Sequence, residues 1–136
     1  EDQLKKITDF ADKSEDKLLL LQDSAVFTIK RSTLVIGRNK VSIIERYGFK
    51  DEKIISINIE DLLNVTVSVS AFLGTVNLYT KYYAKEPLKM KSLSRKNAFL
   101  AKRVIQGLLV CKEKKMDINK IPRRDLLAQL ERIGKA

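Results

Sequence analysis

Residues 65–80 read VTVSVSAFLGTVNLYT, and this stretch decides the fold class. Val65, Val67 and Val69 alternate with hydroxyl-bearing residues, which is the period of a strand that buries one face. Residues 72–74 then predict a short loop, and a second alternating strand follows over residues 75–80. The two segments predict an antiparallel hairpin with a fixed register, because a slip by one residue would expose the apolar side chains.

The same period of two extends on both sides of this hairpin. Upstream, alternating segments occur at 27–29, 34–36, 41–45 and 55–59, separated by Arg31-Ser32, by the turn residues 37–40 and by the polar loop 49–52. Downstream, Leu88 and Met90 predict a short final strand, and Pro87 favours an edge position, where a missing N–H is tolerated. Together these segments predict a meander of about seven short antiparallel strands.

A helical period begins at about Ser94. Its apolar stripe comprises Ala98, Ala101, Ile105 and Leu108, and basic residues occupy the opposite face. Gly107 within this helix costs roughly 1 kcal/mol relative to alanine, which indicates a close crossing with a strand. A second, shorter helix is expected after Ile121-Pro122, with Gly134 as its C-cap. The apolar stripe of that helix is formed by Leu126, Leu127 and Leu130.

The N-terminal segment has a less decisive pattern. Leu4, Ile7 and Ala11 share a face at helical spacing, and Ser14 is a candidate N-cap for a helix running into Leu18. Two short helices, or one helix and a strand, fit this segment equally well. We therefore expect a helical extension over residues 1–23, the main strand-rich unit over residues 24–112, and a helical appendage over residues 113–136.

Catalysis is disfavoured by the residues that the chain lacks. With no histidine, the commonest general base is missing, as are Ser-His, Cys-His and His-metal sites. The glycines stand singly, so no phosphate-binding loop is predicted. Cys111, the only cysteine, lies on the apolar stripe and is expected to be an inert buried thiol. We predict a protein that is not an enzyme, with no cofactor and no metal site.

Charge is distributed unevenly along the chain. Residues 1–61 hold 11 Lys and Arg against 12 Asp and Glu, whereas residues 62–136 hold 16 against 5. The net charge of +10 therefore comes from the second half. Such a charge attracts nucleic acid, anionic lipid headgroups or an acidic protein, although a basic surface that only improves solubility fits the counts equally well.

The cellular compartment of the protein is predicted from two further features. A single cysteine excludes an intrachain disulfide, which favours a reducing environment. No segment approaches the roughly 20 apolar residues that a membrane-spanning helix needs, and the first residues lack the order of a signal peptide. A cytoplasmic location is expected, with a peripheral position at the inner face of the membrane as the alternative.

The order of strands followed by one amphipathic helix resembles the pleckstrin-homology-like superfold, particularly its bacterial members. The resemblance covers residues 24–112 and implies an α+β protein that is mainly β: a bent seven-stranded antiparallel barrel, its open end capped by the helix, with a role in binding. Lipid-binding relatives carry basic residues around the loop between their first two strands. The corresponding positions here are Lys30, Arg31, Arg38 and Lys40. Their spacing is looser than in the family, and lysine stands at the last position, where arginine would bind phosphate in bidentate geometry.

Three binding functions are predicted, in order of preference. The first is protein interaction or self-association, through a sheet edge near Pro87–Lys91 and the stripe Leu126, Leu127 and Leu130. The second is peripheral binding to anionic membrane, and the third is sequence-independent binding of nucleic acid. Both of these would use a second basic set, comprising Lys81, Lys85, Lys89, Lys91, Arg95 and Lys96.

A base-stacking platform for nucleic acid could be formed by the aromatic residues Phe72, Tyr79, Tyr82 and Tyr83. Packing between strands explains such aromatic residues more often.

Overall fold

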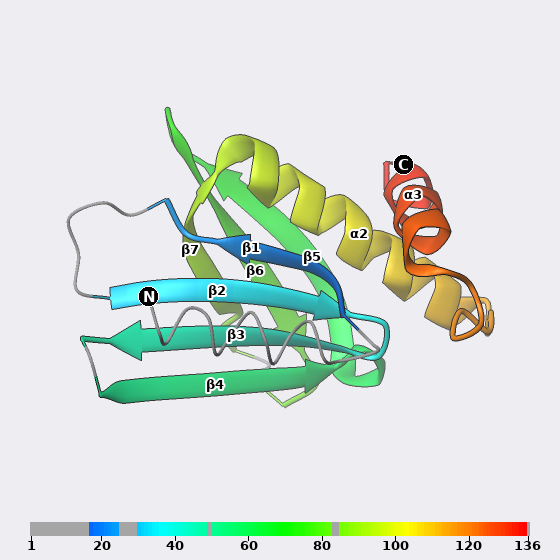
Figure 1. The fold of residues 1–136 in the computed structure, drawn as a ribbon, viewed down its shortest axis with the longest axis horizontal. Helices are drawn as coiled ribbons and strands as arrows, with labels where there is room; N and C mark the ends of the chain where they lie inside the picture. Colours follow the sequence, from blue (N-terminus) through cyan, green and yellow to red (C-terminus); the bar gives the residue numbers. More distant parts are fainter. Residues whose placement is uncertain (1–16, 25–29, 49, 83–84, 136) are drawn as a thin grey trace.

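The computed structural model describes residues 17–24, 30–48, 50–82 and 85–135. Seven strands, a 3-10 helix and two α-helices lie in these ranges (Figure 1). The first four strands are β1 (Lys17–Gln22), β2 (Lys30–Gly37), β3 (Lys40–Tyr47) and β4 (Asp51–Asn58). The 3-10 helix η1 (Ile59–Asp61) leads to β5 (Leu62–Val69), β6 (Leu73–Thr80) and β7 (Leu88–Ser94). The helices are α2 (Arg95–Glu113) and α3 (Arg123–Ile133).

The strands form two antiparallel sheets. One has the order β1-β2-β3-β4 and the other the order β5-β6-β7, so each strand pairs with its neighbour in sequence. Figure 1 shows the first sheet running across the view and the second lying behind it at a steep angle. The expected class, mainly β with C-terminal helices, is confirmed within the described residues. The expected closure into one barrel is not observed, because no strand pairing among the described residues joins the two sheets.

One core lies between the sheets and α2. Leu34, Ile36 and Ile43 point into it from the first sheet, and Val76 and Leu78 from the second. Helix α2 contacts β5, β6 and β7, and its buried side chains include the whole predicted stripe. The helix begins where the sequence predicts, because the Ser94 hydroxyl accepts a hydrogen bond from the Asn97 amide at 3.2 Å. Burial of this stripe fixes the helix over the second sheet.

Helix α3 packs on α2 through an unusually close approach. A Cβ atom added to Gly107 would lie 2.4 Å from the Leu130 carbonyl oxygen, and one added to Gly134 would lie 1.8 Å from the Arg103 carbonyl oxygen. Gly107 is therefore required by a neighbouring helix, and the predicted strand crossing is wrong. Gly134 is the C-cap as expected, but its φ of −76° shows that the contact with α2, and not a left-handed turn, requires glycine there.

Of the two interpretations left open for residues 1–23, one helix and a strand agrees with the described part, whereas the helix predicted to run from Ser14 into Leu18 is wrong there. Residues 17–22 form β1, an edge strand whose partner is β2, and Leu18 and Leu21 point into the core. A register shift between Lys17 and Leu19 puts these two leucines on the same side despite their spacing of three. That spacing imitates a helical stripe. The helix expected around Leu4, Ile7 and Ala11 lies outside the described residues.

Three other element boundaries differ from the predictions. Strand β2 runs through Arg31-Ser32 without a break, whereas the alternating segment 27–29 lies outside the described residues. Strand β4 begins at Asp51, inside the expected polar loop, because Asp51 and Glu52 pair with the end of β3. Strand β5 ends at Val69 and β6 begins at Leu73, so the hairpin loop lies two residues earlier than predicted. In β2 and β4 cross-strand pairing extends the strand into polar sequence, and in β6 it extends the strand over Leu73 and Gly74.

Candidate functional site

The four basic residues suggested by the family resemblance are not brought together. Lys30 and Arg31 lie at the start of β2, whereas Arg38 and Lys40 flank the turn that follows its end. Seven residues of extended chain separate Arg31 from Arg38, which is roughly 23 Å. No single phosphate group can contact both pairs.

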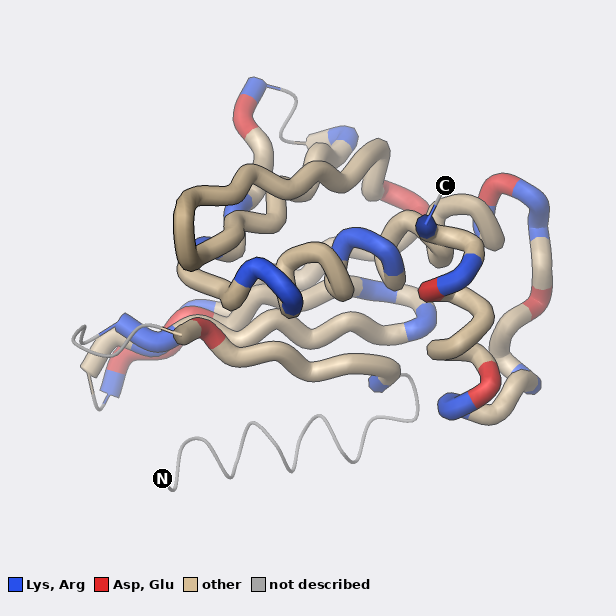
Figure 2. Tube along the Cα trace, turned by 90° about the horizontal axis from the view of Figure 1, so that it is seen from above, with Lys and Arg blue, Asp and Glu red and all other residues tan. Residues whose placement is uncertain are grey.

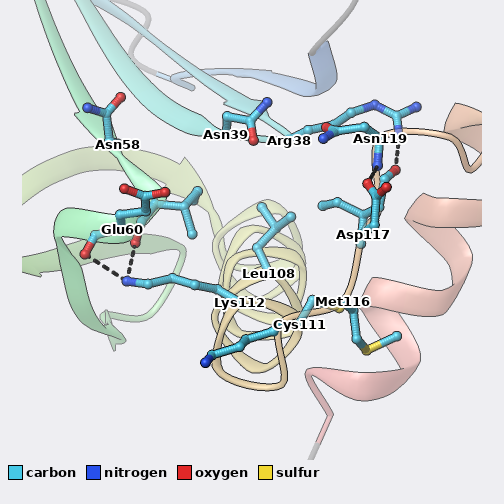
Figure 3. Close-up of a pocket in the computed structure, with 13 residues that line it drawn as sticks. Arg38, Asn39, Asn58, Glu60, Leu108, Cys111, Lys112, Met116, Asp117 and Asn119 are labelled. Carbon is cyan, nitrogen blue, oxygen red and sulfur yellow. Dashed lines mark hydrogen bonds between the residues drawn. The ribbon is translucent and has the colours of Figure 1, made fainter.

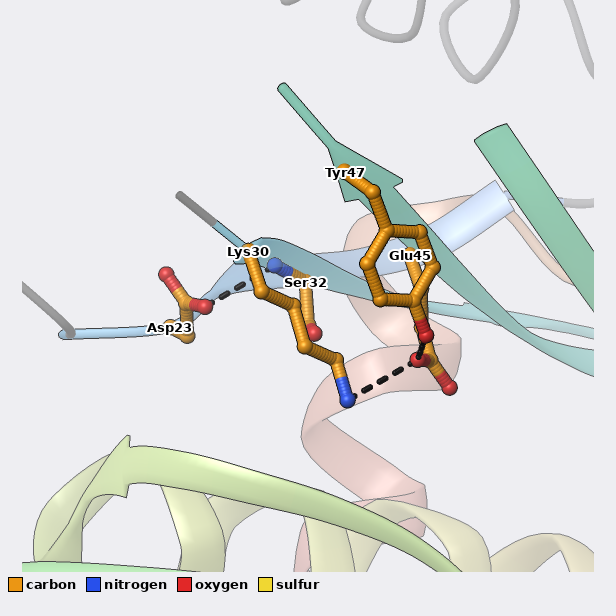
Figure 4. A network of polar contacts seen from close by, with 5 residues as sticks. All are labelled: Asp23, Lys30, Ser32, Glu45 and Tyr47. Carbon is orange, nitrogen blue, oxygen red and sulfur yellow. Dashed lines mark hydrogen bonds and ion pairs between the residues drawn. The ribbon is translucent and has the colours of Figure 1, made fainter. Parts of the chain in front are cut away.

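The two residues at the start of β2 are held by carboxylates, and Figure 4 shows the contacts of Lys30. Lys30 Nζ lies 2.9 Å from Glu45 Oε2, and the Tyr47 hydroxyl donates a hydrogen bond to the same oxygen. Arg31 pairs with Asp23 at 3.7 Å, and Asp23 Oδ2 accepts a hydrogen bond from the Ser32 amide at 2.9 Å. These residues tie β2 to β3 and to the end of β1, which gives them a structural role.

The network of Figure 4 makes the free energy of unfolding depend on pH in the acidic range. The hydrogen bond from Tyr47 and the neighbouring Lys30 ammonium keep the pKa of Glu45 below its ordinary value of 4.5. A carboxyl with a lowered folded pKa stabilises the fold above its unfolded pKa and loses this contribution as the pH falls through the folded value. We predict that Glu45→Gln loses less stability than the wild type between about pH 5 and pH 3. Urea denaturation at both pH values measures this, and equal losses for the two proteins would contradict it.

Arg38 belongs to a different feature, a cavity of about 420 Å³ at the C-terminal end of α2 (Figure 3). The guanidinium donates to the Ile118 carbonyl oxygen, and Lys112 Nζ donates to the carbonyl oxygens of Ile59 and Glu60 at 2.9 and 2.7 Å. Both cations thus hold backbone segments around the cavity mouth. Its wall mixes cations, carboxylates, amides and apolar groups, a combination that does not point to one class of ligand.

Cys111 also lines this cavity but is buried. Burial raises the pKa of its thiol, so the thiolate form is disfavoured near neutral pH. This agrees with the expectation of an inert structural cysteine, made from its position on the apolar stripe.

The leucine stripe predicted as a protein contact is occupied within the chain. Leu126 and Leu130 are 1% and 0% exposed because α3 packs them against α2, and Leu127 is partly buried against the same core. The predicted sheet edge near Pro87–Lys91 does exist, since β7 is the last strand of its sheet. Part of that edge is already used, because the Ser92 carbonyl oxygen accepts a hydrogen bond from the Ser24 amide at 2.6 Å.

The second set of basic residues divides into two groups. Lys81 and Lys85 lie in the connection from β6 to β7, and Lys89 is beside them in the first half of β7. Lys91, Arg95 and Lys96 lie at the other end, where β7 passes into α2. Figure 2 shows several basic positions in succession along α2, with acidic ones on neighbouring segments. Exposed Tyr79 and Tyr82 adjoin the first group, and the exposed apolar residues Val69, Phe72 and Leu73 adjoin the group at the α2 end.

Those apolar residues form the tip of the β5–β6 hairpin. Phe72 is 85% exposed, and Val69 and Leu73 beside it are also exposed. The tip is fixed to α2, because Arg95 Nη1 donates to the Ser70 carbonyl oxygen at 2.9 Å and Gly74 lies against Ala98. We define the tip surface as the apolar residues Val69, Phe72 and Leu73 together with the basic residues Lys91, Arg95 and Lys96.

The aromatic residues compared with a base-stacking platform are separated by the same geometry. Phe72 precedes β6, whereas Tyr79 lies near the end of that strand and Tyr82 follows it, a separation of roughly 20 Å or more. Tyr83 lies outside the described residues. The described aromatics thus do not form one stacking surface.

Sequence reasoning assigned Phe72 only to a loop and to this aromatic group, and did not predict an apolar tip. The apolar and polar alternation of the two flanking strands indicated only where the hairpin turns. The signal that could have found the tip is the composition of the turn itself, since Ala-Phe-Leu replaces the polar residues that ordinarily occupy a hairpin loop.

Comparisons with known proteins assign no family to this chain. The chain matches no protein-family model and no curated protein. Among the residues that the structure describes, no helix combines the length and the apolar character needed to cross a bilayer.

Proposed function

We propose that this chain docks on an anionic membrane surface through the tip surface. The observation that carries the proposal is Phe72, an aromatic side chain that is 85% exposed on a hairpin tip beside exposed Val69 and Leu73. An isolated exposed apolar residue needs no explanation, but a contiguous apolar group surrounded by polar residues marks an interaction site. The adjacent cations match the charge of anionic headgroups.

The geometry favours an interface between water and lipid. The apolar side chains lie at the end of the hairpin, while Arg95 and Lys96 lie in the first turn of α2 behind it. Apolar residues that enter the acyl region while nearby cations remain at headgroup level are the arrangement of peripheral membrane proteins. The hydrogen bond from Arg95 to Ser70 holds the tip and part of this charge in one rigid unit.

The expected affinity is modest. Removing a phenylalanine side chain from water contributes about 2 kcal/mol, and each cation near an anionic surface contributes about 1 kcal/mol. With the three cations of the tip surface, the sum is about 5 kcal/mol, which corresponds to a dissociation constant of roughly 0.1–1 mM. We therefore expect reversible binding that weakens when salt is added.

The fold assignment belongs to the same proposal. Four strands, then three strands, then an amphipathic helix over the second sheet support the resemblance to pleckstrin-homology-like domains. That resemblance implies binding without catalysis, and the proposed location is a peripheral one at the inner face of the membrane. Protein interaction through the leucine stripe is not proposed, because Leu126 and Leu130 are covered by α2 and are inaccessible to a partner.

Vesicle sedimentation tests the proposal. We expect the protein to pellet with vesicles that contain an anionic phospholipid, to remain in solution with purely zwitterionic vesicles, and to dissociate at high salt. Equal pelleting with both vesicle types, or none with either, would overturn the proposal. Salt-sensitive binding to single-stranded DNA without binding to vesicles would favour the nucleic-acid alternative.

A further inference from the structure

A hollow adjoins the tip surface, and the inference drawn from it rests on the proposed function. It has a volume of about 350 Å³ and is lined by residues of the β5–β6 hairpin and of β7. Its wall contains four hydroxyl-bearing residues, one lysine and two apolar residues of the tip. These are Ser68, Ser70, Thr75, Ser92, Lys91, Val69 and Leu73. We infer that this hollow binds the phosphomonoester group of an anionic lipid headgroup.

Strand pairing brings the hydroxyl groups together. Ser68 is opposite Thr75 across the β5–β6 ladder. On the other side of Thr75 the β6–β7 register shifts, and Ser92 takes a φ of 67° at this irregularity. The shift places Lys91 and Ser92 beside Thr75, so residues of three strands meet in the hollow.

A buried amide makes hydroxyl groups on this face available as donors. The Asn77 side chain is buried, and its Nδ2 donates to Thr66 Oγ1 at 3.2 Å and to Ser68 Oγ at 3.1 Å. Each hydroxyl oxygen accepts from this amide, so its own proton is left to point toward an external acceptor. Ser68 therefore presents a donor to the hollow.

Lys91 supplies the charge. Among the residues that the structure describes, Lys91 forms no ion pair, although the neighbouring hollow that it also lines contains Asp23 and Glu45. Both carboxylates are already engaged, Glu45 by Lys30 and Asp23 by Arg31. The ammonium of Lys91 is thus available on the hydroxyl side, where no carboxylate lines the wall.

The number and kind of donors favour a phosphomonoester. A terminal phosphate carries three acceptor oxygens and a charge of about −1.5 to −2, whereas a phosphodiester has two free oxygens and a single charge. The Ser70 hydroxyl already donates to the Leu73 carbonyl oxygen at 3.3 Å. The hydroxyls of Ser68, Thr75 and Ser92, with the Lys91 ammonium, are left as donors for the three terminal oxygens of a monoester. The position next to Val69 and Leu73 places such a group at the level of headgroups when the tip is inserted.

The test compares two kinds of vesicle with matched surface potential, one containing phosphatidic acid and the other phosphatidylglycerol. We expect the wild type to bind the monoester vesicles roughly tenfold more tightly. Lys91→Gln and Ser68→Ala should bring this ratio close to one. Lys96→Gln is the matched control, because it removes one cation of the tip surface outside the hollow and should weaken binding to both vesicles while preserving the ratio.

Three outcomes separate the inference from the proposed function. Equal binding of the wild type to both vesicles would overturn the inference and leave membrane docking standing, whereas absence of binding to either would overturn both. A ratio unchanged in Lys91→Gln would also overturn the assignment to this hollow. Inorganic phosphate serves as the second source of the same chemistry: we expect it to compete only at millimolar concentration, and competition at micromolar concentration would mean a site for soluble phosphate.

Discussion

Replacing Gly107 with alanine is expected to destabilise the protein by about 2 kcal/mol. The added methyl group would lie 2.4 Å from the Leu130 carbonyl oxygen and 2.9 Å from the Leu130 carbonyl carbon. Backbone atoms cannot move away as a side chain can, so α3 must shift from α2 and expose Leu126 and Leu130. Helix propensity alone would make the alanine variant more stable by about 1 kcal/mol. A loss of stability therefore reports the contact between α2 and α3.

Chemical denaturation followed by circular dichroism measures this difference. Gln106→Ala is the matched control, since the side chain is only partly buried in the same turn of α2. We expect its stability to remain within about 0.5 kcal/mol of the wild type. A Gly107→Ala protein as stable as the control would mean that α3 does not pack on α2 as described.

Phe72→Ser is expected to weaken binding to anionic vesicles by about tenfold to a hundredfold. The substitution removes about 2 kcal/mol of apolar transfer free energy from the interface. Because the side chain is 85% exposed in the free protein, stability should change little. Sedimentation at several lipid concentrations gives the affinity, and thermal denaturation checks the fold.

Leu63→Ser is the matched control for this prediction. Leu63 is also an exposed apolar residue, 59% exposed, but it lies at the opposite end of β5 from the tip. We expect its vesicle binding to equal that of the wild type. An equal loss in both variants would indicate a general apolar effect and would contradict docking through the hairpin tip.

Local patterns predicted the elements whose own periodicity and capping residues are regular. The hairpin of β5 and β6, the Ser94 N-cap and the stripe from Ala98 to Leu108 all follow from periodicity and capping within a short window. Strand β1 could not be recognised in this way. Its leucines have helical spacing, and only the pairing with β2 and the register shift at Lys17 show that this segment is a strand.

The candidate site was predictable only in part. Lys91, Arg95 and Lys96 were selected from the excess of positive charge in the second half of the chain, but charge counts cannot separate them from Lys81 and Lys85. Their association with Phe72 depends on the hydrogen bond from Arg95 to Ser70, which joins residues 25 positions apart. The donors of the hollow likewise depend on cross-strand contacts of Asn77 that no local pattern contains.

The most direct test of membrane docking places a fluorescent reporter at the tip. The chain contains no tryptophan, so Phe72→Trp introduces a single tryptophan at that position, and Leu63→Trp provides the same reporter at the far end of β5. With anionic vesicles, the emission of Phe72→Trp should move to shorter wavelength and be quenched by lipids brominated on their acyl chains, while Leu63→Trp remains unchanged. Unchanged emission from Phe72→Trp while the protein pellets with the vesicles, or a shift confined to Leu63→Trp, would contradict insertion of the β5–β6 tip.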